Sequence, residues 1–146
     1  MLSVADRLAI TELAGRFAFA IDFHNGAAMA DCFTDDGAFE WYAPVPFTPG
    51  AEELRCSAKG GAELTAFGAG TRAIAGTPAA SRAPGGPVFT GPLHVTSNHT
   101  VEEVGGTVTH RCYLVGAGGI GVYTGEVVRA GEQWKFKHRK IVAGNH

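Results

Sequence analysis

The stretch LHVTSNHTVEEVGGTVTHRCYLV, residues 93–115, contains two strand-like halves joined at Gly105-Gly106. A glycine pair between alternating apolar and polar residues is a strong signal for a β-hairpin. Two more strand-like segments follow after glycine-containing turns, at residues 120–129 and 133–142. The last third of the chain is therefore predicted to be an antiparallel meander.

The chain before this meander is predicted to be mainly helical. The first helix covers about residues 3–23, with Ser3 as its N-cap and Asp6 completing a capping-box pattern. Three further elements are expected: a short helix over about 26–33, an aromatic-rich strand over 38–45 and a third helix from near Ser57. Helices followed by a meander are typical of an α+β fold, with the helices on one face of a curved sheet.

Composition limits the classes of protein to consider. The chain has 146 residues, which fits one domain over residues 1–146, and 45% of them are hydrophobic. The net charge of −2 gives no electrostatic case for binding nucleic acid. No apolar run reaches the length of a membrane span, and the N-terminus has no secretory pattern, so a cytoplasmic protein is expected. The three cysteines are widely spaced and predict no zinc site.

Asp22 is the first candidate for chemistry. On a helical wheel it shares a side with Gly15, Ala18 and Phe19, away from Arg16. A buried carboxylate needs a partner or a pocket. The alternative is an aspartate in water at the end of the helix, since the helix is expected to stop two residues later.

His94 opens the first strand of the hairpin. Period-two alternation groups it with Thr96, Asn98 and Thr100 on a polar side that either lines a wet pocket or faces solvent. His110, on the next strand, shares a side with apolar residues, which favours a core or pocket-edge histidine over a catalytic one.

Other residues carry weaker signals. Trp41 and Tyr42 are expected to pack, with one of them presenting a polar tip to a cavity. The remaining histidines have no metal-like spacing, so no metal is predicted. The glycine-rich turns lack the lysine and the following helix of a phosphate-binding loop.

Several motifs, taken in order, resemble the SnoaL-like, scytalone dehydratase-like family of the nuclear transport factor 2-like superfamily. They are Asp6-Arg7-Leu8-Ala9-Ile10, Asp22, Asp31-Cys32-Phe33-Thr34-Asp35-Asp36-Gly37, His94-Val95-Thr96-Ser97-Asn98, Gly105-Gly106, Tyr113, and Trp134-Lys135-Phe136 before His138-Arg139.

The resemblance implies a cone: a strongly bent antiparallel sheet wrapped on about three N-terminal helices around an apolar pocket. In the enzymes of the family a histidine is the base and a helix-end aspartate orients it, roles that correspond to His94 and Asp22. The substrate-binding residues would be Tyr42, Asn98, His110 and Trp41.

This family pattern implies a cofactor-independent lyase or isomerase of dehydratase type, acting on a small hydrophobic cyclic or polyketide-like substrate. Phe17 and Ile21 occupy positions where lindane dehydrochlorinase and scytalone dehydratase have a lysine and a tyrosine, so neither of those reactions is implied. The alternative is a non-catalytic subunit that binds a hydrophobic ligand or serves assembly. A homodimer or homotrimer is expected, and the Pro- and Gly-rich segment 76–91 is expected to act as a lid or an oligomer arm.

Overall fold

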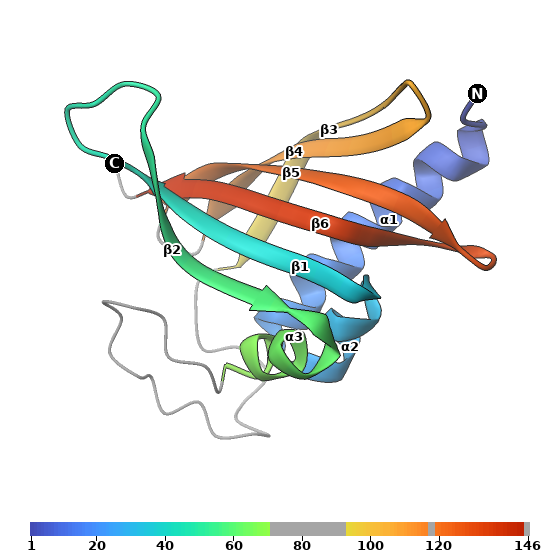
Figure 1. Ribbon diagram of the computed structural model, residues 1–146, viewed down its shortest axis with the longest axis horizontal. Helices are drawn as coiled ribbons and strands as arrows, with labels where there is room; N and C mark the ends of the chain where they lie inside the picture. The colour runs from blue at the N-terminus through green and yellow to red at the C-terminus, as the bar shows by residue number, and fades with distance from the viewer. Residues whose placement is uncertain (71–92, 117–118, 145–146) are drawn as a thin grey trace.

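The computed structural model describes residues 1–70, 93–116 and 119–144; the segment 76–91 lies outside this part of the chain. The described elements are α1 (Val4–Asp22), α2 (Gly26–Asp31), β1 (Phe33–Pro44), β2 (Glu52–Lys59), α3 (Gly60–Gly68), β3 (His94–Val104), β4 (Thr107–Gly116), β5 (Gly119–Ala130) and β6 (Gln133–Gly144). Figure 1 shows α1 running along one face of a curved sheet, with α2 and α3 side by side at one end. This is the predicted α+β cone.

The six strands form one sheet in the order β2-β1-β6-β5-β4-β3. The meander β3-β4-β5-β6 is antiparallel, as predicted. β1, however, pairs with β6 in parallel, so the sheet is mixed. A parallel pair needs a long crossover, and here the chain between β1 and β6 includes β2, α3 and the rest of the meander.

Two boundaries in the first half differ from the prediction. Residues 52–59 form β2, so the third helix begins at Gly60 and not near Ser57. The Thr34–Gly37 segment, with its turn-like composition, belongs to β1 and coincides with a register shift between Phe33 and Ala38. Neither β2 nor this irregularity has a clear periodic signal in the sequence.

The N-terminal end of α1 is fixed as predicted. The Ser3 hydroxyl accepts from the Asp6 backbone N–H at 3.1 Å, and the Asp6 carboxylate accepts from the Ser3 backbone N–H at 3.0 Å. Asp6 also accepts from Trp134 Nε1 on β6 at 3.0 Å, which connects the start of α1 to the sheet. The Ser3 and Trp134 hydrogen bonds together lower the pKa of Asp6 to about 2.

Aromatic packing fills the space between α1 and the sheet. Phe17 lies at its centre, 1% exposed, with ring centroids of Phe33, Phe39, Tyr123 and Phe136 between 5.6 and 6.1 Å away. Around this group the core cluster includes Ile10, Leu13, Met29, Leu64, Val127 and Ile141. No helix in the described ranges is long and apolar enough to span a bilayer.

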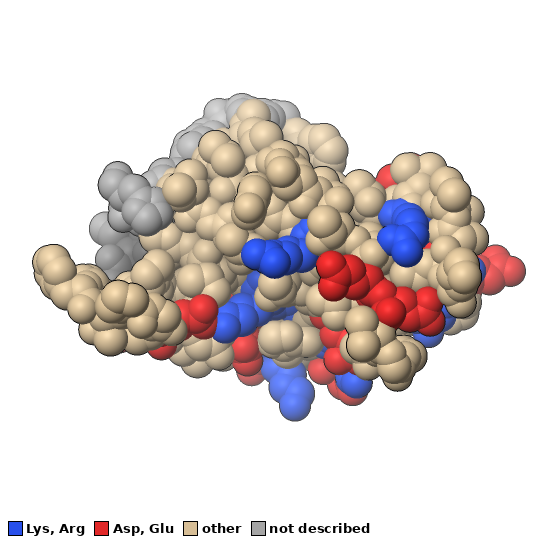
Figure 2. All heavy atoms as spheres, turned by 90° about the horizontal axis from the view of Figure 1, so that it is seen from above, with Lys and Arg blue, Asp and Glu red and all other residues tan. Residues whose placement is uncertain are grey.

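Charged side chains of both signs are interspersed where they appear in Figure 2, and no broad basic patch is visible on this face. The surface seen from above therefore offers no continuous positive field of the kind that attracts polyanions.

Candidate active site

Asp22 is the last residue of α1. The helix ends because Phe23 caps it and His24 adopts a left-handed backbone conformation, with φ of 54°. Asn25 then caps α2 by accepting from the Ala28 N–H at 3.0 Å. A carboxylate at the C-terminal end of a helix faces the negative end of the helix dipole, which is unfavourable unless other groups donate to it.

His94 is the first residue of β3, opposite Gly116 on β4. Gly116 has φ of 118°, and a Cβ at this position would lie 1.8 Å from the Leu93 carbonyl oxygen. Only glycine allows the two strands to approach this closely. The glycine thus allows the start of β3, where His94 lies, to pack closely against the end of β4.

His94 and Asp22 form a close pair. His94 Nδ1 lies 2.5 Å from Asp22 Oδ1, and the His94 backbone N–H donates to both carboxylate oxygens at 3.2 and 3.1 Å. The side chains are 19% and 9% exposed, respectively. These donors offset the unfavourable position of Asp22 at the helix end.

The pairing determines which imidazole nitrogen can act as a base. A carboxylate accepts hydrogen bonds, so Nδ1 of His94 carries a proton and the neutral ring has its lone pair on Nε2. Within the described residues, no group hydrogen-bonds to Nε2. The arrangement is that of a general base oriented by a carboxylate.

Asn98 does not share the side of His94. β3 has an irregularity between Ser97 and Thr100, and Asn98 is exposed with φ of 56°. The bulge inserts an extra residue and shifts the alternation, so that His99 and Val101 face inward. The predicted polar face of His94, Thr96, Asn98 and Thr100 is therefore wrong beyond Ser97.

The two aromatic candidates on β1 lie on opposite sides of the sheet. Trp41 packs against the core and its Nε1 donates to the Ala143 carbonyl at 3.4 Å. Tyr42 donates to Glu40 Oε2 at 3.0 Å, and the Lys140 ammonium lies 4.4 Å from its ring centroid. Tyr42 thus belongs to a charged group on the outer face and does not meet His94.

His110 is fully buried, in a polar cluster deep in the cone. Its Nδ1 lies 3.3 Å from Arg139 Nη1 and its Nε2 lies 3.0 Å from His99 Nδ1. Arg139 is also fully buried, and its Nε has no partner within the described residues. Burial, with the nearby Arg139 charge, lowers the pKa of His110 to about 3, so this ring is neutral at pH 7.

His99, His110 and Cys112 bring three potential metal-ligand atoms within 4.8 Å of one another. Arg139 can only donate, so His110 Nδ1 accepts from it and the neutral ring holds its proton on Nε2. Nε2 then donates to His99 and offers no lone pair to a metal. As arranged, these residues form a hydrogen-bonded chain instead of a ligand set.

The low pKa of His110 predicts an acid-dependent loss of stability. The unfolded chain, with an ordinary pKa of 6.5, binds this proton more readily than the folded chain, so stability should fall as the pH drops from about 6.5 towards 3. Urea unfolding of wild type and His110→Gln at several pH values measures this. We expect a shallower fall in the variant; identical slopes would contradict the assignment.

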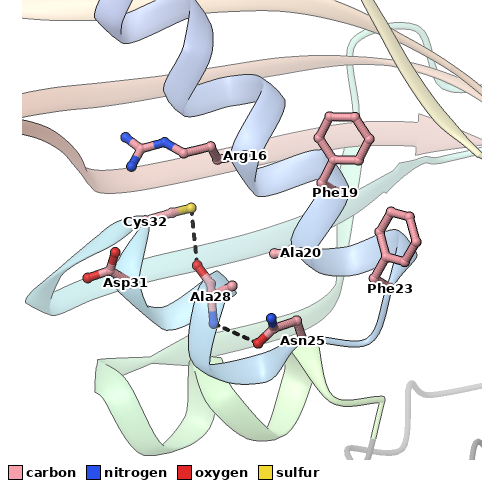
Figure 3. Close-up of a pocket in the computed structure, with 8 residues that line it drawn as sticks. All are labelled: Arg16, Phe19, Ala20, Phe23, Asn25, Ala28, Asp31 and Cys32. Atoms are coloured by element: carbon pink, nitrogen blue, oxygen red, sulfur yellow. Dashed lines mark hydrogen bonds between the residues drawn. The ribbon is translucent and has the colours of Figure 1, made fainter. Parts of the chain in front are cut away.

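A separate hollow of about 320 Å³ lies between α1 and α2 and does not include the His94–Asp22 pair. Figure 3 shows Phe19 and Phe23 together on one side of it and Arg16 with Asp31 on the other. Cys32 closes the hollow and donates to the Ala28 carbonyl at 3.3 Å. Burial raises the pKa of the Cys32 thiol to about 11, so the group stays protonated at neutral pH, as expected of a packing residue.

Arg139 and Tyr123 lie on the inner face of the sheet, and neither was expected from the sequence to belong to the site. The Arg139 guanidinium carbon lies 4.2 Å from the ring centroid of Tyr123. An irregularity between β5 and β6 changes the inward alternation of β6 after Phe136 and turns Arg139 inward in place of His138. Simple alternation from Phe136 would have placed His138 and Lys140 inside, so period two could not have found Arg139.

The mixed sheet with the helices on its inner face is an α+β cone, the fold of solved structures described as cystatin-like or nuclear transport factor 2-like. The chain belongs to the SnoaL-like family, whose domain model matches residues 3–140. No curated protein matches the sequence.

Solved structures share this fold. A protein of unknown function with a cystatin-like fold from Nostoc punctiforme is 23% identical, with a TM-score of 0.71 over 98% of this chain and 94% of that chain. A putative scytalone dehydratase from Novosphingobium aromaticivorans is 20% identical, with a TM-score of 0.64 over 97% and 85%. The β subunit of a putative aromatic-ring-hydroxylating dioxygenase from the same organism is 14% identical, with a TM-score of 0.71 over 97% and 91%.

Proposed function

We propose that the protein is a cofactor-independent lyase or isomerase of the dehydratase type, in which His94 removes a proton from a small hydrophobic cyclic or polyketide-like substrate. The observation that carries this proposal is the 2.5 Å contact between His94 Nδ1 and Asp22 Oδ1, with Nε2 unpartnered within the described residues. The membership of the SnoaL-like family and the similarity to a putative scytalone dehydratase agree with it.

In the proposed step, His94 Nε2 takes a proton from the carbon next to a substrate carbonyl. The C–H electron pair becomes a C=C bond and the carbonyl electrons move to the oxygen. Asp22 stabilises the imidazolium that forms by accepting from Nδ1. In a β,γ-unsaturated ketone, return of the proton to the γ-carbon of the dienolate gives the conjugated isomer. In a β-hydroxy ketone, departure of the hydroxyl with that proton gives water and an α,β-unsaturated ketone.

We assign apolar contact with the substrate to Trp41, which packs against the core. His110 would line the buried end of the site as a neutral ring. Tyr42 and Asn98 are not retained as substrate-binding residues, because Tyr42 interacts with Glu40 on the outer face and Asn98 is exposed.

The oligomeric state and the location are still predictions: a homodimer or homotrimer in the cytoplasm. Light scattering of the purified protein tests the oligomeric state.

The competing proposal is a subunit without catalysis, as the similarity to a dioxygenase β subunit suggests. The backbone hydrogen bonds from His94 to Asp22 would also serve a structural role. Such a role does not require a histidine ring on the carboxylate with its second nitrogen unpartnered within residues 1–70, 93–116 and 119–144. The enzyme proposal explains this pair and is preferred for that reason.

Exchange of α-hydrogens for deuterium tests the proposal without knowledge of the natural substrate. Cyclic ketones, including 2-tetralone, are incubated with the protein in D2O and followed by proton NMR. We expect wild type to accelerate exchange for at least one ketone, and His94→Ala to lose about 10²–10⁴-fold of that rate, the usual contribution of a general base.

The matched control is His138→Ala, because His138 is a half-exposed histidine paired with Glu40 on the outer face. This variant should exchange at the wild-type rate. Exchange that is equally fast in His94→Ala, or no acceleration of any ketone by wild type, would refute the proposed function.

A further inference from the structure

Tyr123 lies on the inner face of β5 and is 2% exposed, yet within the described residues its hydroxyl has no hydrogen-bond partner. Buried tyrosine hydroxyls usually find one. Nε of Arg139, whose guanidinium lies against the Tyr123 ring, is also buried and unpartnered within these ranges. A phenol that is nearly buried but unsatisfied indicates a place where another polar group binds.

The ring of Tyr123 is held on two sides. Phe17 of α1 packs edge to face with it, with centroids 5.7 Å apart, and the Arg139 guanidinium lies 4.2 Å from its centroid. Neither contact uses the hydroxyl. The ring is therefore held in place, and the position of its hydroxyl oxygen is set before any ligand arrives.

Arg139 has no carboxylate partner among the described residues. Its guanidinium is surrounded by the rings of Phe17, Tyr123 and Phe136, with His110 and the Cys112 thiol as its polar neighbours. A buried cation without a counter-ion is costly, and cation–π contacts offset only part of that cost. Its field favours negative charge on whatever binds beside Tyr123.

Register connects this wall to the His94–Asp22 pair. Tyr123 is opposite Cys112, and Leu114, two residues further along β4, is opposite Thr96 on β3. Thr96 follows His94 on the same side of β3, before the bulge. His94 and Tyr123 therefore both lie on the inner side of the sheet, on two strands that are separated only by β4.

We propose that Tyr123, whose ring packs against Arg139, is the oxyanion-binding residue of this site. The substrate is then a neutral ketone whose carbonyl oxygen points to the Tyr123 hydroxyl. The inference rests on the proposed proton abstraction by His94. As the α-carbon loses its proton to His94, the electron pair moves to the carbonyl oxygen, which accepts from the Tyr123 O–H. The net charge of the site and its substrate does not change in this step, because the His94 imidazolium and the enolate form together.

Equilibrium binding of an enolate mimic tests this role separately from turnover. The probe is 4-nitrophenol, at a pH at which the free probe is ionised, and nitrobenzene is its uncharged counterpart. We expect wild type to bind the phenolate more tightly than nitrobenzene. Tyr123→Phe should weaken phenolate binding by about 10²-fold, as for loss of one oxyanion donor, and leave nitrobenzene binding unchanged.

Tyr113→Phe is the matched control, because Tyr113 is 47% exposed on β4 and its hydroxyl has no part in the proposed site. It should bind both probes as wild type does. Three results would overturn the inference. Wild type and Tyr123→Phe could bind the phenolate equally well, or Tyr123→Phe could bind nitrobenzene as much more weakly as it binds the phenolate. Wild type could also show no preference for the phenolate over nitrobenzene.

The two proposals fail in different ways. A Tyr123-dependent preference for phenolate, together with ketone exchange that His94→Ala leaves intact, would retain the oxyanion site and remove His94 as the base. If exchange depends on His94 but phenolate binding does not depend on Tyr123, His94 is retained as the base and Tyr123 is removed as the oxyanion-binding residue.

Discussion

Asp22→Asn is expected to slow ketone α-hydrogen exchange by about 10²–10⁴-fold, as much as loss of the base itself. An amide at this position can donate its N–H to His94 Nδ1, which favours the tautomer with its proton on Nε2 and removes the lone pair that takes the substrate proton. It also removes the charge that stabilises the imidazolium. Binding of nitrobenzene should change little, because the apolar wall is intact.

Asp36→Asn provides the control for Asp22→Asn. Asp36 is an exposed aspartate on β1 whose carboxylate accepts from the Thr34 hydroxyl. The same change of charge there should leave the exchange rate unaltered. A wild-type rate in Asp22→Asn would show that the carboxylate does not orient the base.

Phe17→Ala is expected to cost about 3–5 kcal/mol in the free energy of unfolding, the range for a fully buried phenylalanine. Phe17 is 1% exposed and its ring contacts four aromatic rings and the Arg139 guanidinium, so its removal leaves a cavity at the centre of the core. The loss should also loosen the ring of Tyr123.

Phe19→Ala on the same helix is the comparison for Phe17→Ala, because Phe19 is 66% exposed. It should change stability by no more than about 0.5 kcal/mol, as for most surface substitutions. Urea unfolding followed by circular dichroism measures both variants. Similar losses in the two would contradict the assignment of Phe17 to the core.

The sequence predicted the α+β class and the meander because glycine turns and period-two alternation are local signals. The capping box of Ser3 and Asp6 was predicted for the same reason, and both of its hydrogen bonds are present. β2 was missed because residues 52–59 are mostly exposed along an edge strand and carry no alternating pattern.

The site was predictable only in part. His94 and Asp22 are 72 positions apart, and the family resemblance, not periodicity, suggested their contact. Asn98 was grouped with His94 because alternation cannot foresee a bulge, and the same kind of irregularity in β6 concealed Arg139. Tyr123 gave no signal, since a tyrosine in a strand is ordinary and only packing reveals that its hydroxyl is unpartnered.

The most direct test of a base steered by a carboxylate is the exchange rate of the double variant, His94→Ala with Asp22→Asn, beside the two single variants. Asp22 acts only through His94 in this account, so the double variant should exchange within about twofold of His94→Ala alone. A double variant slowed by the product of the two single effects would mean that the two residues act independently, and would contradict the proposed pair.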